Sequence, residues 1–326
     1  MSLQDGVTVY CLTFNHAPYI EQTIHGFLSQ NVNFPVHIII HDDASTDGTQ
    51  TVIREFVSKY PNQITTIFQN ENQYSKHTDI YETFIVPLIQ TEYVCICEGD
   101  DFWSDPNKLK SQYDYMQAHS ECSMCVHNTD RVTAAGKCLE HPFSALNEDR
   151  DYFADQIIAS GGGILFHTSS FMYRHRYRQE IPDCYYISDV GDYPLAIHMS
   201  TCGHIHYIGK IMSMYRVNTP GSWTQRVVSN PEKHVRHLNS VIQMLQRADE
   251  TTMKKYHTAF QEAIRKNMYD IYITKNQIIS ILKNSKYRNL FIKEPKSRQV
   301  KLLLRGFAGP LLHPIKRLVQ TVISRK

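Results

Sequence analysis

Short apolar runs alternate with helical patterns along the first hundred residues. The runs span residues 7–13, 36–41, 64–68 and 93–97, and they are rich in β-branched and aromatic side chains. Nearly continuous apolar runs of this length are typical of strands that are buried on both faces of a sheet. Between the runs, apolar residues recur at helical spacing, as in Ile20, Ile24 and Phe27. This alternation predicts an α/β fold with a mostly parallel sheet flanked by helices.

Helical patterns continue after the fourth run and dominate the last third of the chain. Ser104-Asp105-Pro106 combines an N-cap residue with a proline, which predicts that a helix begins there. Residues 120–220 contain short strand-like pieces, and a turn followed by a helix is expected at 188–200. Residues 228–282 are helical in pattern. The sheet should therefore be followed by a helical C-terminal extension.

Polar residues stand at the end of each apolar run. Seven of them are acids, namely Asp42, Asp43, Asp47, Glu71, Glu98, Asp100 and Asp101. The carboxyl ends of parallel strands meet at one edge of a sheet, and ligands bind outside that edge. We therefore predict that the active site lies there.

The fourth run ends in three acids within four positions, Glu98, Asp100 and Asp101. Neighbouring carboxylates repel each other unless they are protonated or neutralised. A hard cation such as Mn²⁺ or Mg²⁺ binds oxygen ligands and leaves coordination positions for phosphates. The chain has no G-x-G-x-x-G after the first run and no P-loop motif, which argues against a dehydrogenase-type dinucleotide fold and a P-loop hydrolase. A metal-bound diphosphate is the ligand that this pattern favours.

The net charge of the 326-residue chain is only +2, but the charges are unevenly distributed. Residues 283–326 contain twelve Lys or Arg and one acid, so this tail carries +11 and residues 1–282 carry 2 − 11 = −9. Apolar residues from Leu311 to Val322 recur at helical spacing. A basic amphipathic segment predicts that 295–326 binds an anionic membrane surface, with nucleic acid or mere solubility as alternatives. Nucleic acid is disfavoured because the body is acidic and no basic motif is interleaved with aromatic residues.

The expected compartment follows from what the sequence lacks. No apolar run approaches the ~20 residues of a membrane span, and residues 1–10 do not have the pattern of a secretion signal. We therefore expect a cytoplasmic protein, peripheral at the inner face of the membrane. The eight cysteines fit that compartment as free thiols. Cys122-x-x-Cys125 has a metal-like spacing, but no second pair completes a zinc site.

Four segments together carry a resemblance to a known family. "VTVYCLTFNHAPYIEQTI", "IIIHDDASTDGT" and "EGDDFWSDPNKLKSQ", in this order and spacing, resemble the family-2 glycosyltransferases of GT-A fold. Residues 191–223 resemble the acceptor half of the bacterial capsule and lipopolysaccharide type. The resemblance implies a GT-A domain over 1–225, with a donor half (1–120) and an acceptor half (121–225). A helical extension (226–282) and the basic tail (283–326) follow it.

The resemblance also implies an activity. The family moves a sugar from a nucleotide-diphosphate donor, here expected to be a UDP-sugar, to an acceptor hydroxyl, and the expected transfer is inverting and metal-dependent. The acceptor would be a growing cell-surface glycan or a lipid-linked oligosaccharide. The alternatives are a non-catalytic nucleotide- or sugar-binding protein and a sugar nucleotidyltransferase. The latter is disfavoured because "TFNHAPYI" lacks the Gly, Arg or Lys of a phosphate loop.

Positions that match the family's motifs imply roles in donor binding. These positions are Thr13, Phe14, Asn15, Asp42, Asp43, Glu98 and Gly99. Asp43, with Asp42 beside it, would contact the base, although this loop could also be only a helix N-cap. Glu98-Gly99-Asp100 stands where the family has Asp-x-Asp, so Glu98 is a departure. Asp100, and next Asp101, would hold Mn²⁺ or Mg²⁺.

In the acceptor half, the family's catalytic base is an acid just before an apolar helix. Asp192 matches it, and Asp189 is the competitor. An inverting transfer needs a carboxylate across the sugar from the metal, to take the proton of the attacking hydroxyl. Arg216 and His206 would bind the leaving group of the donor. Asp192 could also be a plain N-cap of the helix that follows it.

Overall fold

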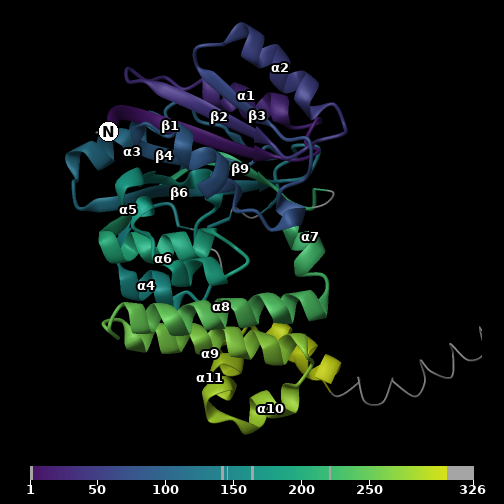
Figure 1. The fold of residues 1–326 in the computed structure, drawn as a ribbon. Helices are drawn as coiled ribbons and strands as arrows, with labels where there is room; N and C mark the ends of the chain where they lie inside the picture. The colour runs from purple at the N-terminus through teal and green to yellow at the C-terminus, as the bar shows by residue number, and fades with distance from the viewer. Residues whose placement is uncertain (1–2, 141–142, 145, 163–164, 220–221, 307–326) are drawn as a thin grey trace, which may run out of the picture. The chain divides into compact units, whose positions relative to one another are not determined.

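The computed structural model describes residues 3–140, 143–144, 146–162, 165–219 and 222–306 (Figure 1). The chain divides into two compact units. The first comprises Met1–Ile157, Ile164–Ile181 and Asp192–Pro220, and the second comprises Ile158–Gly163, Pro182–Gly191 and Gly221–Lys326. Two short segments from the middle of the chain therefore belong with the C-terminal helices, which the sequence pattern does not reveal.

The four predicted strands form one half of a nine-stranded sheet in the first unit. They are β1 (Gln4–Thr13), β2 (Val36–Asp42), β3 (Ile64–Phe68) and β4 (Thr91–Ile96). They lie in the order β3-β2-β1-β4, and all three pairings are parallel. Consecutive residues Ile38, Ile39 and Ile40 of β2 are fully buried, as expected of a strand covered on both faces. The α/β fold class is thereby confirmed.

The other half of the sheet is mixed, so the sheet is less parallel than predicted. Its strands are β5 (Phe102–Trp103), β6 (Cys122–Val132), β7 (Arg150–Tyr152), β8 (Met172–Arg174) and β9 (His204–Arg216). The order continues β4-β8-β6-β9-β5, and β7 pairs with β9. β6 and β9 are parallel, whereas β8, β5 and β7 are antiparallel to their neighbours. These three strands have two or three residues each, too few for a hydrophobic period to reveal them.

Helices of the first unit cover the sheet. They are α1 (Ile20–Leu28), α2 (Thr49–Lys59), α3 (Lys108–Ala118), α5 (His175–Gln179) and α6 (Asp192–Cys202), while α4 (Ala154–Ala159) crosses the boundary between the units. Shorter turns are η1 (Tyr74–Lys76), η2 (Tyr81–Ile85), η3 (Val86–Leu88) and η4 (Thr168–Ser170). Ile20, Ile24 and Phe27 of α1 are buried in the main core with β1 and β2, as their spacing predicts.

The third helix begins later than predicted. α3 starts at Lys108, two residues after Pro106. The Asp105 carboxylate accepts a hydrogen bond from the N–H of Asn107 (2.8 Å), and the Asp105 carbonyl accepts one from the N–H of Lys108 (3.2 Å). Asp105 therefore closes a turn ahead of the helix rather than capping its first residue.

The second unit is helical, in agreement with the pattern over 228–282. It contains η5 (Asp183–Ile187), α7 (Trp223–Val227), α8 (Pro231–Thr251), α9 (His257–Thr274), α10 (Ile278–Lys283), α11 (Ser285–Lys293) and a helical stretch over 296–306. The start of α8 follows from its sequence, because the Asn230 side chain accepts from two N–H groups of the first turn and Pro231 follows it. The part of the predicted tail beyond residue 306 lies outside the described residues.

Two further expectations concern cysteines and membrane spans. All eight cysteines are free thiols, and Cys122 and Cys125 are buried in β6. Among the helices that the structure describes, none is long and apolar enough to cross a bilayer.

Candidate active site

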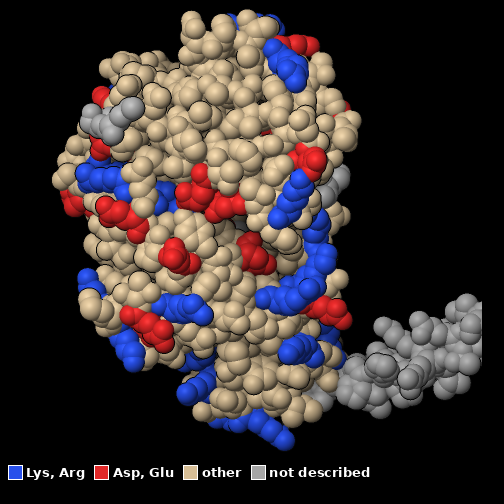
Figure 2. Space-filling view, viewed as in Figure 1, with Lys and Arg blue, Asp and Glu red and all other residues tan. Residues whose placement is uncertain are grey.

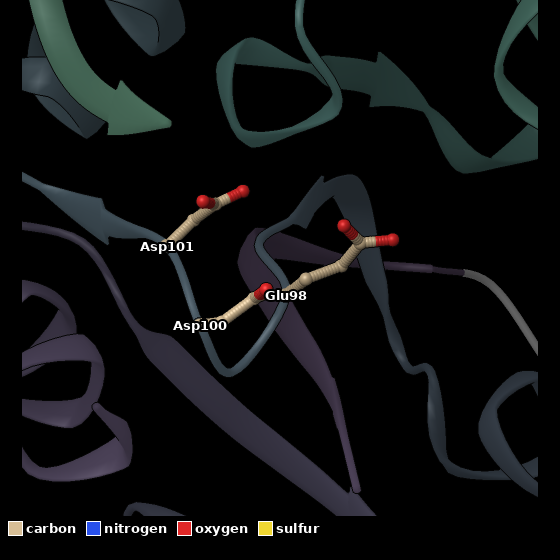
Figure 3. Close-up of side chains that lie close together, drawn as sticks. All are labelled: Glu98, Asp100 and Asp101. Carbon is tan, nitrogen blue, oxygen red and sulfur yellow. The ribbon is translucent and has the colours of Figure 1, made fainter. Parts of the chain in front are cut away.

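Three of the seven predicted acids, Glu98, Asp100 and Asp101, lie in a turn at the carboxyl end of β4. We call this turn, residues 97–101, the acid turn. The N–H of Gly99 donates to the carbonyl of Leu12 (2.9 Å), so the turn is held against the end of β1. Ligand oxygens of Glu98, Asp100 and Asp101 lie within 4.8 Å of one another (Figure 3). No other group of three His, Cys, Asp or Glu residues fits a metal ion within the part of the chain that the structure describes.

The carboxyl groups of the acid turn differ in exposure and in proton affinity. Asp101 is 1% exposed, and burial together with the charges of Asp100 and Glu98 raises its pKa well above the usual range. The pKa of Glu98 is raised to about 8 by desolvation, by Asp100 and by Asp192. Because the Glu98 side chain is exposed, we ascribe its raised pKa mainly to repulsion between carboxylates. A bound cation would remove that repulsion.

Asp101 has one satisfied oxygen and one orphaned oxygen. Its Oδ1 accepts a hydrogen bond from the N–H of Arg216 (2.8 Å). Its Oδ2 is buried without a hydrogen-bond partner, and the Nε2 of His167 lies 3.7 Å away. Burial lowers the pKa of His167 to about 3, so this imidazole is neutral at physiological pH. A buried carboxylate oxygen without a partner is costly, and a metal ion would satisfy it.

Arg216 lies beside the acid turn and supports it. Its guanidinium is buried and donates to the carbonyl of Asp100 and to the side-chain oxygen of Gln22. The same group lies over the rings of Tyr19 and Phe102, 4.8 and 4.7 Å from their centroids. Arg216 is predicted to bind the sugar donor, and this stays a prediction: Nη1 and Nη2 each donate one hydrogen bond to the protein, while Nε is buried without a hydrogen-bond partner. The Arg216 side chain holds the backbone of the acid turn in place.

The end of β1 packs tightly against the acid turn. A Cβ on Gly99 would lie 2.6 Å from the Thr13 Oγ1 and 2.9 Å from the His16 Nδ1. Both of these atoms are buried without a hydrogen-bond partner. The other ring nitrogen of His16, Nε2, lies 4.0 Å from Asp100. Orphaned polar atoms of this kind are typical of a site whose ligand supplies the missing partner.

His16 is a site residue that the sequence prediction did not select. Burial lowers its pKa, although the charges of Asp100, Asp47 and Asp42 act in the opposite direction. Its N–H donates to the hydroxyl of Thr49 (2.9 Å) at the start of α2, which fixes the backbone at this point. Its position directly after Asn15, at the end of a predicted strand, is the sequence feature that could have identified it as a site residue.

The acids after β2 are buried and have hydrogen-bond partners. Asp42 accepts from the Gln50 side chain (2.6 Å) through Oδ1, while its Oδ2 is buried without a partner. Asp43 accepts from the backbone N–H of Gln73 (2.6 Å) and of Tyr74 (3.1 Å), one with each oxygen. Asp43 therefore anchors the loop after β3. Contact with a base would use the second lone pair that each oxygen retains.

The loops after β1 and β2 are bonded to one another. The N–H of Asn15 donates to the Ser45 hydroxyl (2.8 Å), and the Asn15 side chain accepts from the N–H of Thr46 (2.8 Å). Asn15 has a left-handed backbone (φ 56°), and the ring of Phe14 beside it is exposed. Asp47 also accepts from the N–H of Thr49, the first residue of α2, although the N-cap residue itself is Gly48 and makes no side-chain cap. The hydrogen bonds of Asn15 hold the two loops together at the ends of β1 and β2.

The two candidate bases have different surroundings. Asp192 is the first residue of α6 in the first unit, and its charge contributes to raising the pKa of Glu98. Asp192 therefore lies within electrostatic reach of the acid turn. Asp189 belongs to the second unit, where its carboxylate is hydrogen-bonded to His237 and to Ser240 (3.0 Å) of α8.

His206 is not part of this group, which corrects the prediction. It lies near the start of β9, ten residues before Arg216, and this spacing is about 30 Å along a strand. Its Nδ1 lies 2.7 Å from Asp151, and its ring stacks on Tyr115 at 3.5 Å between centroids. The carboxyl end of β9 meets the acid turn, so a residue near the amino end of β9 lies toward the opposite edge of the sheet.

Similarity to known proteins identifies the family of the chain. The sequence profile of glycosyl transferase family 2 matches residues 8–181, which is more than half of the chain. The chain belongs to this family. This family-2 glycosyltransferase is 30% identical over 218 residues to an uncharacterized Mycobacterium tuberculosis protein. The match covers 67% of this chain and 60% of that protein. It is also 30% identical over 114 residues to the putative teichuronic acid biosynthesis glycosyltransferase TuaG of Bacillus subtilis, covering 35% and 43%. The chain thus spans about 60% of the length of the mycobacterial relative.

Solved structures show the fold of this family-2 glycosyltransferase. S. aureus TarS 1–349 in complex with UDP superposes with a TM-score of 0.55 at 12% identity, covering 92% of this chain and 78% of that chain. The mannosyltransferase PcManGT from Pyrobaculum calidifontis, in complex with GDP-Man and Mn²⁺, superposes with a TM-score of 0.52 at 16% identity, covering 93% and 86%. The predicted GT-A architecture is thereby confirmed.

Proposed function

We propose that this family-2 glycosyltransferase moves a sugar, with inversion, from a UDP-sugar to a hydroxyl of a cell-surface glycan or a lipid-linked oligosaccharide. The observation that carries the proposal is the convergence of Glu98, Asp100 and Asp101 at the carboxyl edge of the sheet, within reach of the charge of Asp192. The UDP bound to TarS and the teichuronic acid named for TuaG favour this donor and this class of acceptor.

The residues of the acid turn suit a divalent cation, Mn²⁺ or Mg²⁺. Asp100 and Asp101 would hold it, with Glu98 beside them, and the orphaned Oδ2 of Asp101 is the atom that most needs such a partner. When bound, the cation would stabilise negative charge on the diphosphate leaving group. Mn²⁺ is present in the PcManGT complex, which supports this assignment. Thr13 and His16 supply further polar atoms at the same edge.

Asp192 is the proposed general base. The acceptor oxygen attacks the anomeric carbon, the bond from that carbon to the diphosphate oxygen breaks with its electron pair, and the hydroxyl proton passes to the Asp192 carboxylate. Asp189 is less suited, because it is bonded through Oδ1 to His237 and Ser240 of α8, whereas the charge of Asp192 acts on Glu98 of the acid turn. Asp42 and Asp43 would face the nucleoside, and Arg216 would act indirectly by holding the acid turn.

A donor screen tests the proposal. Calorimetry with UDP-, GDP-, CMP- and dTDP-sugars, each with and without Mn²⁺, should give tight binding of UDP-sugars only when the metal is present. Asp100→Asn should abolish the metal-dependent part of donor binding. Asp192→Asn should leave donor binding unchanged and lower the rate of sugar transfer by about 10²–10⁴-fold. Asp189→Asn is the matched control and should retain transfer.

The alternatives give different results in the same screen. Metal-dependent binding without hydrolysis or transfer, over a panel of glycan acceptors, would favour a non-catalytic nucleotide- or sugar-binding protein. Release of pyrophosphate from a nucleoside triphosphate and a sugar phosphate would identify a nucleotidyltransferase. Absence of any metal-dependent nucleotide binding would contradict the proposed function.

A further inference from the structure

The end of the second unit is strongly basic. Residues 278–306, which form α10, α11 and the following helix and which we call the basic end, contain eight Lys or Arg and one acid, 8 − 1 = +7. The basic residues are Lys283, Lys286, Arg288, Lys293, Lys296, Arg298, Lys301 and Arg305, and all of them are exposed. Figure 2 shows Lys and Arg without Asp or Glu on the visible face around α10 and α11. Such a surface attracts an anionic partner.

The same helices also expose large apolar side chains. Ile279, Ile292, Val300 and Leu304 are 50–65% exposed. Their inward-facing neighbours are already buried, in a small core formed by Tyr269, Ile278, Ile281, Phe291 and Leu302. The four exposed side chains are therefore not among the residues that form this core. Exposed apolar residues of this kind mark an interaction surface.

Apolar and basic residues alternate closely on this outer surface. Val300 and Leu304 are one helical turn apart, and Lys301 and Arg305 directly follow them in the sequence. Ile292 stands next to Lys293 in α11. Long basic side chains can keep their charges at the level of lipid headgroups while neighbouring apolar side chains enter the acyl boundary. An anionic bilayer uses both kinds of residue at once.

We propose that the basic end docks the protein on a bilayer surface that carries anionic lipids. Residues 307–326 cannot neutralise the charge of this surface, because they contain four Lys or Arg and no acid. A nucleic acid would use the charges but would leave the four exposed apolar side chains in water. Docking itself does not depend on the proposed function. Only its purpose, which is access to a lipid-linked acceptor, rests on that function.

Vesicle co-sedimentation of the full chain tests the proposal. Vesicles of phosphatidylcholine with about one third phosphatidylglycerol should retain the protein, and pure phosphatidylcholine should not. The triple variant Ile292→Ser, Val300→Ser, Leu304→Ser and the triple variant Arg288→Glu, Lys293→Glu, Lys301→Glu should each bind less well. The charge variant should lose about a hundredfold or more in partition coefficient, since each basic residue near such a surface contributes about fivefold.

Matched controls come from the first unit. Phe153→Ser removes an equally exposed apolar side chain, and Lys59→Glu with Lys137→Glu reverses exposed charges. These variants should bind vesicles within about threefold of the unmodified chain, after allowance for long-range attraction. Circular dichroism and calorimetric donor binding should be unchanged in all variants, which separates loss of docking from misfolding and from failure of the proposed function.

Several results would overturn the proposal. One is that anionic vesicles retain both triple variants as well as they retain the unmodified chain. A second is loss of binding in the charge variant with full binding in the apolar variant, which would indicate a soluble polyanion such as RNA, and competition by RNA would then confirm it. A third is a dimer of the unmodified chain in sedimentation velocity that dissociates in the apolar variant, which would assign the surface to a second copy.

Discussion

Gly99 has no room for a side chain, because Thr13 and His16 pack against its Cα. Gly99→Ala must shift the acid turn away from β1. We expect the free energy of unfolding to fall by about 1–3 kcal/mol, as in overpacked sites, and metal-dependent donor binding to weaken. Gly191→Ala is the control, because a Cβ there meets no atom within 4 Å. Equal urea midpoints for the two variants would contradict this account of the turn.

The Glu98 carboxyl group predicts a pH dependence. Its pKa is raised from 4.5 to about 8, so between these values the folded chain holds a proton that the unfolded chain has lost. The contribution of Glu98 to the free energy of unfolding, measured without metal, should therefore be greatest below pH 4.5. It should fall as the pH rises toward 8. Glu98→Gln should flatten the decline of Tm over this range.

Metal reverses the preference of the same carboxyl group. A cation stabilises the ionised form, so Mn²⁺ affinity should increase as the pH rises toward 8, with release of a proton on binding. Calorimetry in buffers of different ionisation enthalpy measures that proton. Mn²⁺ affinity that is flat from pH 6 to 8.5, with no proton released, would show that Glu98 is not part of the site.

The sequence indicates some site residues and hides others, for a physical reason. Three acids directly after a buried strand are costly unless they have a purpose, so Glu98, Asp100 and Asp101 stand out without any structure. His167 lies beside Asp101, but it belongs to a segment that follows no predicted strand. A single histidine in such a segment does not indicate a site residue. His206 was predicted, with Arg216, as a cation on the returning strand and loop, but a strand of thirteen residues places its two ends far apart.

Among the elements, β9 and the acid turn are joined by Arg216. The Arg216 N–H binds Asp101, and its guanidinium binds the carbonyl of Asp100. Arg216→Met keeps the backbone N–H bond to Asp101, but it removes the guanidinium from the carbonyl of Asp100 and from the side-chain oxygen of Gln22. We expect a loss of about 2 kcal/mol or more in the free energy of unfolding, together with weaker metal binding.

Arg54→Met is the control for Arg216. The Arg54 guanidinium also lies over a ring, 4.1 Å from the centroid of Phe68, but it is exposed on α2. Its loss should cost less than about 1 kcal/mol. Denaturant titration of both variants measures the difference, and a similar loss at both positions would mean that Arg216 contributes only packing.

The four strands of the first hundred residues were predictable, whereas β6 and β9, the two longest strands, lie in a region where only short strand-like pieces were expected. Strands β1 to β4 are five or more residues long and rich in apolar or β-branched side chains, and the helical patterns between them indicate parallel pairing. β5, β7 and β8 owe their conformation to the neighbours with which they pair, and two or three residues carry no period of their own. The start of α3 was misplaced because Asp105 has two local uses, as a cap and as a turn residue, and the sequence does not say which one applies.

For the molecule as a whole, the predicted boundary at residue 225 and the observed units differ in an instructive way. The C-terminal unit begins near that position, but it also includes Ile158–Gly163 and Pro182–Gly191. A segment of ten residues that packs on a distant helix has no signature in local hydrophobicity. Pro182–Gly191 is such a segment: Cys184 and Tyr185 of its η5 are buried, and the hydroxyl of Thr251 in α8 donates to the Cys184 Sγ (3.6 Å).

This arrangement predicts the behaviour of a fragment that ends at residue 225. Without α8, Cys184 loses the helix that lies against η5 and becomes accessible to a thiol reagent. Mass spectrometry after brief labelling should find Cys184 modified many times faster in the fragment than in the full chain. Cys138 is exposed in the intact chain and should react at similar rates in both, which makes it the internal control. Protection of Cys184 in a folded fragment would mean that the segment belongs to the first unit, and that the sheet-bearing part of the chain is independent of the helices that follow it.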